Sequence, residues 1–152
     1  MERTDLFKKL ADLAQLDYDA VRVYDEALEH TGEAEITTAF EHFRADHKNH
    51  YEQLTAWIGK AGGEVPRLHV DVMGHAADWL TSIRSLRGTA GALHAMRTAE
   101  KYHNSHYAKA AEWDVDDEEV ATMLRRFYND ERQHLEFVES HLKTPAGAGA
   151  PQ

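Results

Sequence analysis

The stretch Asp130-Glu131-Arg132-Gln133-His134 interrupts an otherwise apolar stripe in the last long helical segment of the chain. The stripe keeps spacings of three and four residues and reads Val120, Leu124, Phe127, Glu131, His134, Val138 and His141. Residues that are three apart lie on one helix face, so Glu131 and His134 should both point inward. Burying such groups without partners costs several kcal/mol each. A metal ion is one way to offset that cost.

Three further segments have the same helical periodicity and also carry polar groups on the core-facing stripe. They run from about 5 to 30, from about 33 to 61 and from about 89 to 113. Their inward-facing polar residues are Asp17, His47, His50, Glu100 and His103. Together with Glu131 and His134, these residues predict a cluster of carboxylates and imidazoles in the core.

A weak internal repeat indicates that these groups lie at one level. The separation between Asp46-His47-x-x-His50 and Asp130-Glu131-x-x-His134 equals, to within one position, the separation between Asp17 and Glu100. Each half of the chain therefore reads as one helix with a single inward acid, followed by one helix with a paired motif. Two helical hairpins related by a pseudo-twofold axis would bring all of these residues together.

The connection between the second and third long helices is too long for a simple hairpin. Ala61-Gly62-Gly63 and Pro66 end the second helix, and a connector without sustained period runs from Gly62 to about His75. A short amphipathic set follows, made of Ala76, Trp79, Leu80, Ile83 and Leu86 and ending at Gly88. Since helices of about 28 residues are roughly 42 Å long, such a crossover lets the second and third helices run parallel. The sequence thus predicts an all-α, up-down-down-up four-helix bundle.

Composition limits the function classes. The chain has 152 residues and no cysteine, which excludes disulfides, iron–sulfur clusters and thiolate metal sites. A net charge of −10 argues against nucleic-acid and anionic-membrane partners. We find neither the apolar run of a signal peptide nor a membrane-spanning stretch, so a cytoplasmic protein is expected. Residues 1–143 should form one domain, followed by a disordered tail over 144–152.

The residues above resemble those of the ferritin-like superfamily, in its rubrerythrin-like bacterial branch, over about residues 5 to 142. The motifs that carry the resemblance are Leu16-Asp17-Tyr18-Asp19-Ala20, Asp46-His47-x-x-His50, Glu100 and Asp130-Glu131-x-x-His134. The resemblance implies a di-iron site with Asp17 and Glu100 as terminal carboxylates, Glu131 as a bridging carboxylate, and His50 and His134 as ligands. It also implies that Asp46 and Asp130 each orient a histidine on the facing helix, as metal-bound imidazoles require.

The chain departs from the family pattern at His47, where the family has a bridging glutamate. A neutral imidazole cannot bridge two metals as a carboxylate does, while His103 adds a further candidate ligand. An asymmetric binuclear site, two sites of unequal affinity and a single-metal site all fit the sequence. Nitrogen and oxygen ligands suit iron, manganese or zinc. Tyr24 and Tyr107 lie near the site and are expected to be core residues with satisfied hydroxyls rather than radical carriers.

Two function hypotheses follow. The first is a non-haem metalloprotein, with iron as its metal, that reacts with dioxygen, peroxide or ferrous iron as an oxidase, peroxidase or ferroxidase. No rubredoxin-type cysteine module is present to relay electrons. The second is a non-enzymatic helical module, metal-free or holding a structural metal, that acts through dimerisation or partner binding. The sequence leaves the choice between a monomer and a homodimer open.

Overall fold

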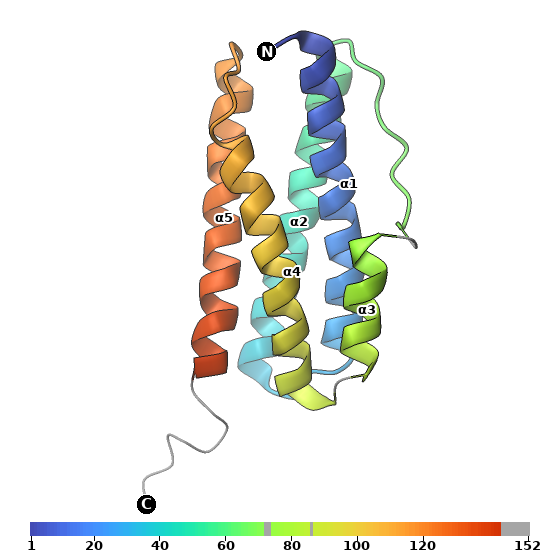
Figure 1. Cartoon of the computed structure of the whole chain (residues 1–152), viewed down its shortest axis with the longest axis vertical. Coiled ribbons are helices and arrows are strands. Elements are labelled where there is room, and N and C mark those ends of the chain that lie inside the picture. Colours follow the sequence, from blue (N-terminus) through green and yellow to red (C-terminus); the bar gives the residue numbers. More distant parts are fainter. Residues whose placement is uncertain (72–73, 86, 144–152) are drawn as a thin grey trace, which may run out of the picture.

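The computed structural model describes residues 1–71, 74–85 and 87–143, and its regular elements are all helices (Figure 1). The helices are α1 (Arg3–Leu28), α2 (Ala34–Lys60), α3 (His75–Ser85), α4 (Gly88–Ala110) and α5 (Glu118–Lys143). α1 and α2 form one antiparallel hairpin and α4 and α5 form another, while α2 and α4 run parallel. The predicted all-α, up-down-down-up bundle with a long crossover is therefore confirmed. Leu86 and the predicted tail over 144–152 lie outside the described residues.

Local sequence explains where the long helices stop and start. At the end of α2, the Gly63 amide donates to the Ile58 carbonyl at 2.8 Å, and the Gly62 amide donates to Gly59 at 3.1 Å. This is a Schellman cap, and it requires the positive φ of 85° that Gly62 adopts without strain. At the start of α5, the Asp117 carboxylate accepts from the Val120 amide at 3.1 Å, so the acidic run from Asp114 to Asp117 supplies the N-cap of this helix.

The predicted end of the first helix was wrong in detail. Thr31 and Gly32 follow the first predicted helix, and a glycine just past the C-terminus predicts a left-handed helix stop at this point. Instead, α1 ends at Leu28, and the positive-φ glycines among the described residues are Gly62 and Gly88. The amides of Glu29 and His30 instead bond to carbonyls of the last turn of α1. A tightened last turn thus satisfies these backbone groups without a left-handed residue.

The apolar core is divided into two clusters by a polar layer at mid-height. One cluster contains Leu6, Leu10, Leu54, Leu124 and other side chains from the end where α1 begins. The second contains Tyr24, Phe40, Met96, Val138 and the buried face of α3. On each long helix the polar residues singled out in the sequence fall between these two groups. The two clusters therefore hold the polar layer from above and below.

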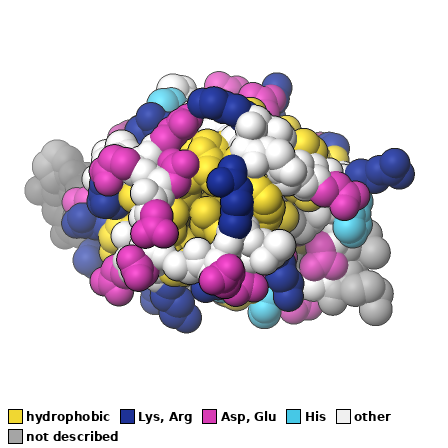
Figure 2. All heavy atoms as spheres, turned by 90° about the horizontal axis from the view of Figure 1, so that it is seen from above, with side chains coloured by type: hydrophobic (Ala, Val, Ile, Leu, Met, Phe, Trp, Pro, Cys, Tyr) yellow, Lys and Arg dark blue, Asp and Glu magenta, His cyan; other side chains and the backbone are white. Residues whose placement is uncertain are grey.

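α3 and the connector cover one side of the bundle. α3 packs on α1 and α4 through Ala76, Trp79 and Ile83, which are all buried. The connector descends along α1, where the Gln15 side chain donates to the His69 carbonyl at 2.5 Å. Figure 2 views the end of the bundle where α1 begins: hydrophobic side chains show at its centre, with a basic side chain lying across them, and most charged side chains lie around the rim. None of the described helices is long and apolar enough to span a membrane.

Replacing Leu54 tests how much the apolar cluster at the end where α1 begins stabilises the bundle. Leu54 is fully buried, so Leu54→Ala should lower the free energy of unfolding by about 2–5 kcal/mol through lost burial and the cavity left behind. Urea unfolding followed by circular dichroism measures this change. Val65→Ala, at a position that is 51% exposed, is the control and should cost less than about 1 kcal/mol. Equal losses in the two variants would contradict the assigned packing.

Candidate metal centre

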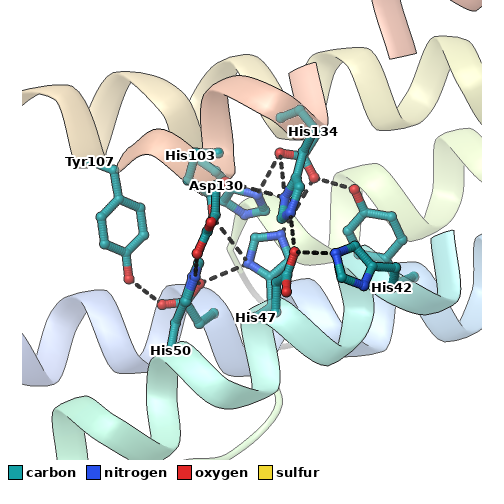
Figure 3. Close-up of polar contacts among 12 residues, drawn as sticks. His42, His47, His50, His103, Tyr107, Asp130 and His134 are labelled. Carbon is teal, nitrogen blue, oxygen red and sulfur yellow. Dashed lines mark hydrogen bonds and ion pairs between the residues drawn. The ribbon is translucent and has the colours of Figure 1, made fainter. Parts of the chain in front are cut away.

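The structure brings all seven predicted polar residues together between the two apolar clusters (Figure 3). None of their side chains is more than 1% exposed. They are Asp17 on α1, His47 and His50 on α2, Glu100 and His103 on α4, and Glu131 and His134 on α5. Every long helix therefore contributes a carboxylate, an imidazole or both to one buried layer.

Two acids at the edge of the layer orient the histidines of the opposite hairpin. Nε2 of His50 lies 3.0 Å from Asp130 on α5, and Nε2 of His134 lies 2.8 Å from Asp46 on α2. These are the acid–histidine contacts predicted from the sequence. Because each acid takes the Nε2 side of its histidine, Nδ1 of that ring is left facing the centre.

Aromatic rings fix the same two histidines from one face. Phe127 stacks on His50 with ring centroids 4.0 Å apart, and Phe43 lies against His134 at 4.2 Å. Phe43 and Phe127 have the same sequence separation as the paired motifs. The position of each phenylalanine on an apolar stripe predicts only an ordinary core residue, whereas the repeat marks the two as a matched pair.

Tyrosine hydroxyls complete the symmetric arrangement. Tyr107 on α4 donates to Oδ2 of Asp17, and Tyr24 on α1 donates to Oε1 of Glu100. Tyr24 and Tyr107 have the same sequence separation as the two acids. The expectation of satisfied hydroxyls is confirmed. That each hydroxyl donates to an acid on the facing helix could not be seen from the apolar stripes. These bonds fix one oxygen of each carboxylate and turn the other toward the centre.

His47 and Glu131 occupy the middle of the layer, between a half that contains Asp17 and His50 (the Asp17 half) and a half that contains Glu100 and His134 (the Glu100 half). Nδ1 of His47 lies 2.8 Å from Oδ1 of Asp17, while Nε2 lies 3.4 Å from Oε1 of Glu100. Oε1 of Glu131 lies 3.4 Å from Nδ1 of His50, and one Glu131 oxygen is 4.0 Å from Nδ1 of His134. Each of these two central side chains therefore offers one atom to each half.

Burial and mutual charge set the pKa values of the layer. Burial alone would raise the pKa of Asp17, but hydrogen bonds with His47 and His50 outweigh it and hold that pKa at about 2. Burial would lower the pKa values of His47 and His50, yet the surrounding carboxylates raise both well above the ordinary value. Without a metal, two imidazolium ions thus neutralise much of the carboxylate charge.

His103 behaves differently from the other histidines. Burial, reinforced by the nearby positive charge of His47, lowers the pKa of His103 to about 3, so the ring is neutral. Neither of its ring nitrogens has a hydrogen-bond partner. Its Nδ1 lies 4.0 Å from Oε2 of Glu100, and its ring centroid lies 5.0 Å from that of His47.

Most buried atoms of the layer that lack a hydrogen-bond partner lie in the half with Glu100 and His134, while Oε1 of Glu131 faces His47 and His50 at 3.4 Å. The buried atoms of Glu100, Glu131 and His134 without hydrogen-bond partners are Oε2 of Glu100, both carboxylate oxygens of Glu131 and Nδ1 of His134. All four can act as metal ligands, and leaving them unpaired is costly. The layer therefore fits a bound cation on the evidence of its own side chains.

Two overlapping groups of residues have the spacing of a metal site. The first is Asp17, His47, His50 and Glu131, and the second is His47, Glu100, Glu131 and His134. Within each group, one ligand atom from every residue lies within 4.8 Å of the others. His103 belongs to neither group, so the structure keeps it beside the site rather than among these atoms.

The four long helices and the long crossover have the architecture of a ferritin-like helical bundle, and the carboxylate–histidine layer lies at its centre. The chain belongs to the family described as domain of unknown function DUF2383, whose model matches residues 5–113. That match includes α1 to α4, while α5 with Glu131 and His134 follows it. A comparison with curated proteins gave no match.

A solved structure shares the fold over nearly the whole chain. It is described as ferritin like, diiron-carboxylate proteins from Bacillus anthracis str. Ames. The alignment covers 93% of this chain and 99% of that chain, with a TM-score of 0.73 and 19% sequence identity. At this identity the likeness establishes the fold, and the chemistry has to be argued from the side chains themselves.

The charge balance of the metal-free layer predicts a pH dependence of stability. Because the folded-state pKa values of His47 and His50 are raised, their contribution is complete below about pH 6.5 and is lost as pH rises through those values. Each histidine can contribute a slope of at most about 1.4 kcal/mol per pH unit. His103, with its lowered pKa, instead reduces stability as pH falls below about 6.5.

Urea unfolding in the presence of a chelator, at pH 5.5, 6.5 and 8.5, measures this dependence. We expect the highest free energy of unfolding near pH 6.5 and a fall on both sides. His47→Gln should flatten the alkaline side, whereas His94→Gln, at an exposed position, should leave the profile unchanged. A stability that is constant from pH 6.5 to 8.5 would contradict the assigned charges.

Proposed function

We propose that the protein is a non-haem iron protein whose bundle centre reduces dioxygen or peroxide with electrons from an external reductant. The observation that carries this proposal is the set of fully buried ligand atoms without partners on Glu100, Glu131 and His134. Bound iron would supply redox chemistry and open coordination positions for a small oxidant. The diiron description of the Bacillus anthracis protein with the same fold supports iron over manganese or zinc.

The two halves of the layer should differ in metal affinity. In the Asp17 half, the carboxylate already accepts a 2.8 Å hydrogen bond from Nδ1 of His47. In the Glu100 half, Oε2 of Glu100, Oε2 of Glu131 and Nδ1 of His134 have no hydrogen-bond partner. A neutral His47 that keeps its Nδ1 proton on Asp17 presents the lone pair of Nε2 to the Glu100 half. We therefore place the tighter ion among His47, Glu100, Glu131 and His134.

The remaining residues prepare this half for an ion. Asp17 orients His47 as a carboxylate orients a metal-bound imidazole, and Asp46 does the same for His134. Tyr24 holds one oxygen of Glu100. The apolar clusters above and below exclude water and so strengthen each electrostatic contact. A second ion in the Asp17 half would have to displace the His47 proton, which lowers its affinity.

Metal analysis of the purified protein and of Glu131→Gln tests the proposal. We expect about one tightly bound iron per chain, a second at higher iron concentration, and loss of both in Glu131→Gln because Glu131 faces both halves. Glu136→Gln, an exposed position on the same helix, is the control and should keep its iron. A protein that takes up no metal would remove the proposed function, and a Glu131→Gln variant less stable than the parent would then leave the layer as a structural charge network.

Replacing His47 tests the inferred asymmetry. His47→Glu introduces a side chain whose two oxygens can each take one ion, as in the family pattern that the sequence resembles. We expect the second iron to bind at least about tenfold more tightly in this variant, measured by titration with ferrous iron under anaerobic conditions. Unchanged affinity for the second ion would show that His47 does not limit metal binding in the Asp17 half.

Membership of the rubrerythrin-like branch and a homodimeric state remain predictions from the sequence.

A further inference from the structure

A cavity of about 360 Å³ opens beside the polar layer, between α1, the connector, α3 and α4. One wall is a continuous group of aromatic rings from α3 and α4. The ring of His75 lies 4.5 Å from that of Tyr102, Trp79 lies 5.3 Å from Tyr102, and His106 lies 4.2 Å from Tyr102. A planar ring bound here would find aromatic faces and edges along one whole side.

The opposite wall and the two ends of the cavity are polar. Asp19 on α1 is 94% buried and accepts at Oδ1 from Gln15 at 3.1 Å and from the Asp71 amide at 3.0 Å. Among the described residues, no hydrogen bond is made to Oδ2 of Asp19, which leaves an acceptor at this end. Lys9 and Lys109 line the other end, and neither forms an ion pair within the described part of the chain.

The charges of the cavity are therefore separated along its length. Lys9 and Asp19 are ten residues apart on α1, which corresponds to about 15 Å of helix. Asp12, three residues from Lys9, and Asp71, whose amide bonds to Asp19, also line the cavity. Lys9 and Lys109 therefore supply the positive charge at one end, and the carboxylates of Asp19 and Asp71 lie at the other.

The aromatic wall also contacts the metal layer. The Trp79 ring lies 5.3 Å from the ring of His103, edge to face, and His103 lies 5.0 Å from His47. Trp79 is thus both a wall of the cavity and a neighbour of the neutral histidine that belongs to neither ligand group. A chain of ring contacts joins the cavity to the candidate ligands.

We propose that this cavity binds a planar hydroxylated aromatic molecule with a negative group at its far end, and that a hydroquinone of this class is the reductant of the metal centre. The hydroxyl would donate to Asp19 and the negative group would meet Lys109. The electron-donor step rests on the proposed function. In that step a hydroquinone loses two electrons and two protons to become a quinone, and one peroxide takes them up to give two waters.

The position of the lysines argues against the other ligand that an aromatic wall attracts. Aromatic cages often bind quaternary ammonium groups, but the Lys9 ammonium already lies 5.0 Å over the Trp113 ring, and Lys109 adds a second cation. A cationic group would meet both lysines at that end, whereas Asp12, Asp19 and Asp71 line the rest of the cavity, so a competing cationic probe separates the two ligand classes. A neutral ring with a hydroxyl donor and a negative tail meets complementary groups at each end.

Binding is tested first with the full chain freed of metal, using calorimetry and 6-hydroxy-2-naphthoate. This rigid, redox-inert probe carries its hydroxyl and carboxylate at opposite ends. We expect a Kd on the order of 0.1–1 mM, weakened at least about fivefold for the methyl ether that lacks the O–H donor. No binding, equal binding of the ether, or preferred binding of benzyltrimethylammonium would overturn the proposal.

Two variants and their matched controls locate the probe. Lys109→Gln should weaken binding about fivefold or more, while Lys101→Gln, exposed on the same helix and not lining the cavity, should leave it unchanged. Trp79→Leu should weaken it as well, whereas Trp57→Leu in the other apolar cluster should not. Binding that ignores Lys109 and Trp79 would overturn the assignment to this cavity.

The donor step is tested separately with iron-loaded protein. We expect peroxide-dependent oxidation of 1,4-dihydroxy-6-naphthoate, whose hydroquinone ring and carboxylate lie at opposite ends, inhibition by the redox-inert probe, and a slower rate at saturating donor in Trp79→Leu with unchanged iron content. If the protein reduces peroxide with ferrous iron but not with the hydroquinone, the donor step is overturned and the proposed function stands. If it binds no iron, the proposed function fails while the binding result still decides the cavity.

Discussion

The structure depends on burying three carboxylates and four histidines in one layer across the bundle. No single helix can satisfy these groups, because the hydrogen bonds that hold them run between helices. Asp46 and Asp130 each hold a histidine of the facing helix, while Tyr24 and Tyr107 connect α1 with α4. The layer therefore fixes the register of all four long helices, since sliding one helix by a turn would leave charged groups against hydrocarbon.

The chain order of these contacts explains the long crossover. The two hairpins are equivalent at the polar layer, because Asp17 and Glu100 are separated by the same stretch of chain, to within one position, as the paired motifs. To place the second hairpin at the same height and in the equivalent orientation, the chain must return along the whole bundle before α4 begins. The connector and α3 make that return. They also cover the outside of α1 and α4, which is how a topological requirement produces the cavity beside the polar layer.

Much of this arrangement could be predicted from the sequence because it depends on periodicity. The stripes that contain Asp17, His47, Glu100 and Glu131 fix the inward face of each helix, and the break at Ala61-Gly62-Gly63 fixes the end of α2. Other features depend on contacts between helices that periodicity does not specify. Tyr24 lies seven positions after Asp17 but bonds to Glu100, and Tyr107 lies seven positions after Glu100 but bonds to Asp17. The predicted stop at Gly32 is absent because a tightened last turn satisfies the end of α1 without it. The cavity depends on how the connector docks, which no stripe encodes.

The asymmetry of the layer connects its stability with its proposed chemistry. At the positions related by the repeat, His47 stands opposite Glu131 and His103 stands opposite Ala20, so both departures from symmetry add an imidazole near Glu100. The added His47 can carry a positive charge when no metal is present, which keeps the carboxylates of a metal-free bundle neutralised and folded. When an ion occupies the Glu100 half, the same ring can lose one proton and offer a nitrogen. A symmetric carboxylate in its place would bind a second ion more readily, but it would leave the metal-free layer with one more buried negative charge. Under the proposed function, His47 therefore lowers the affinity for a second ion and raises the stability of the metal-free bundle.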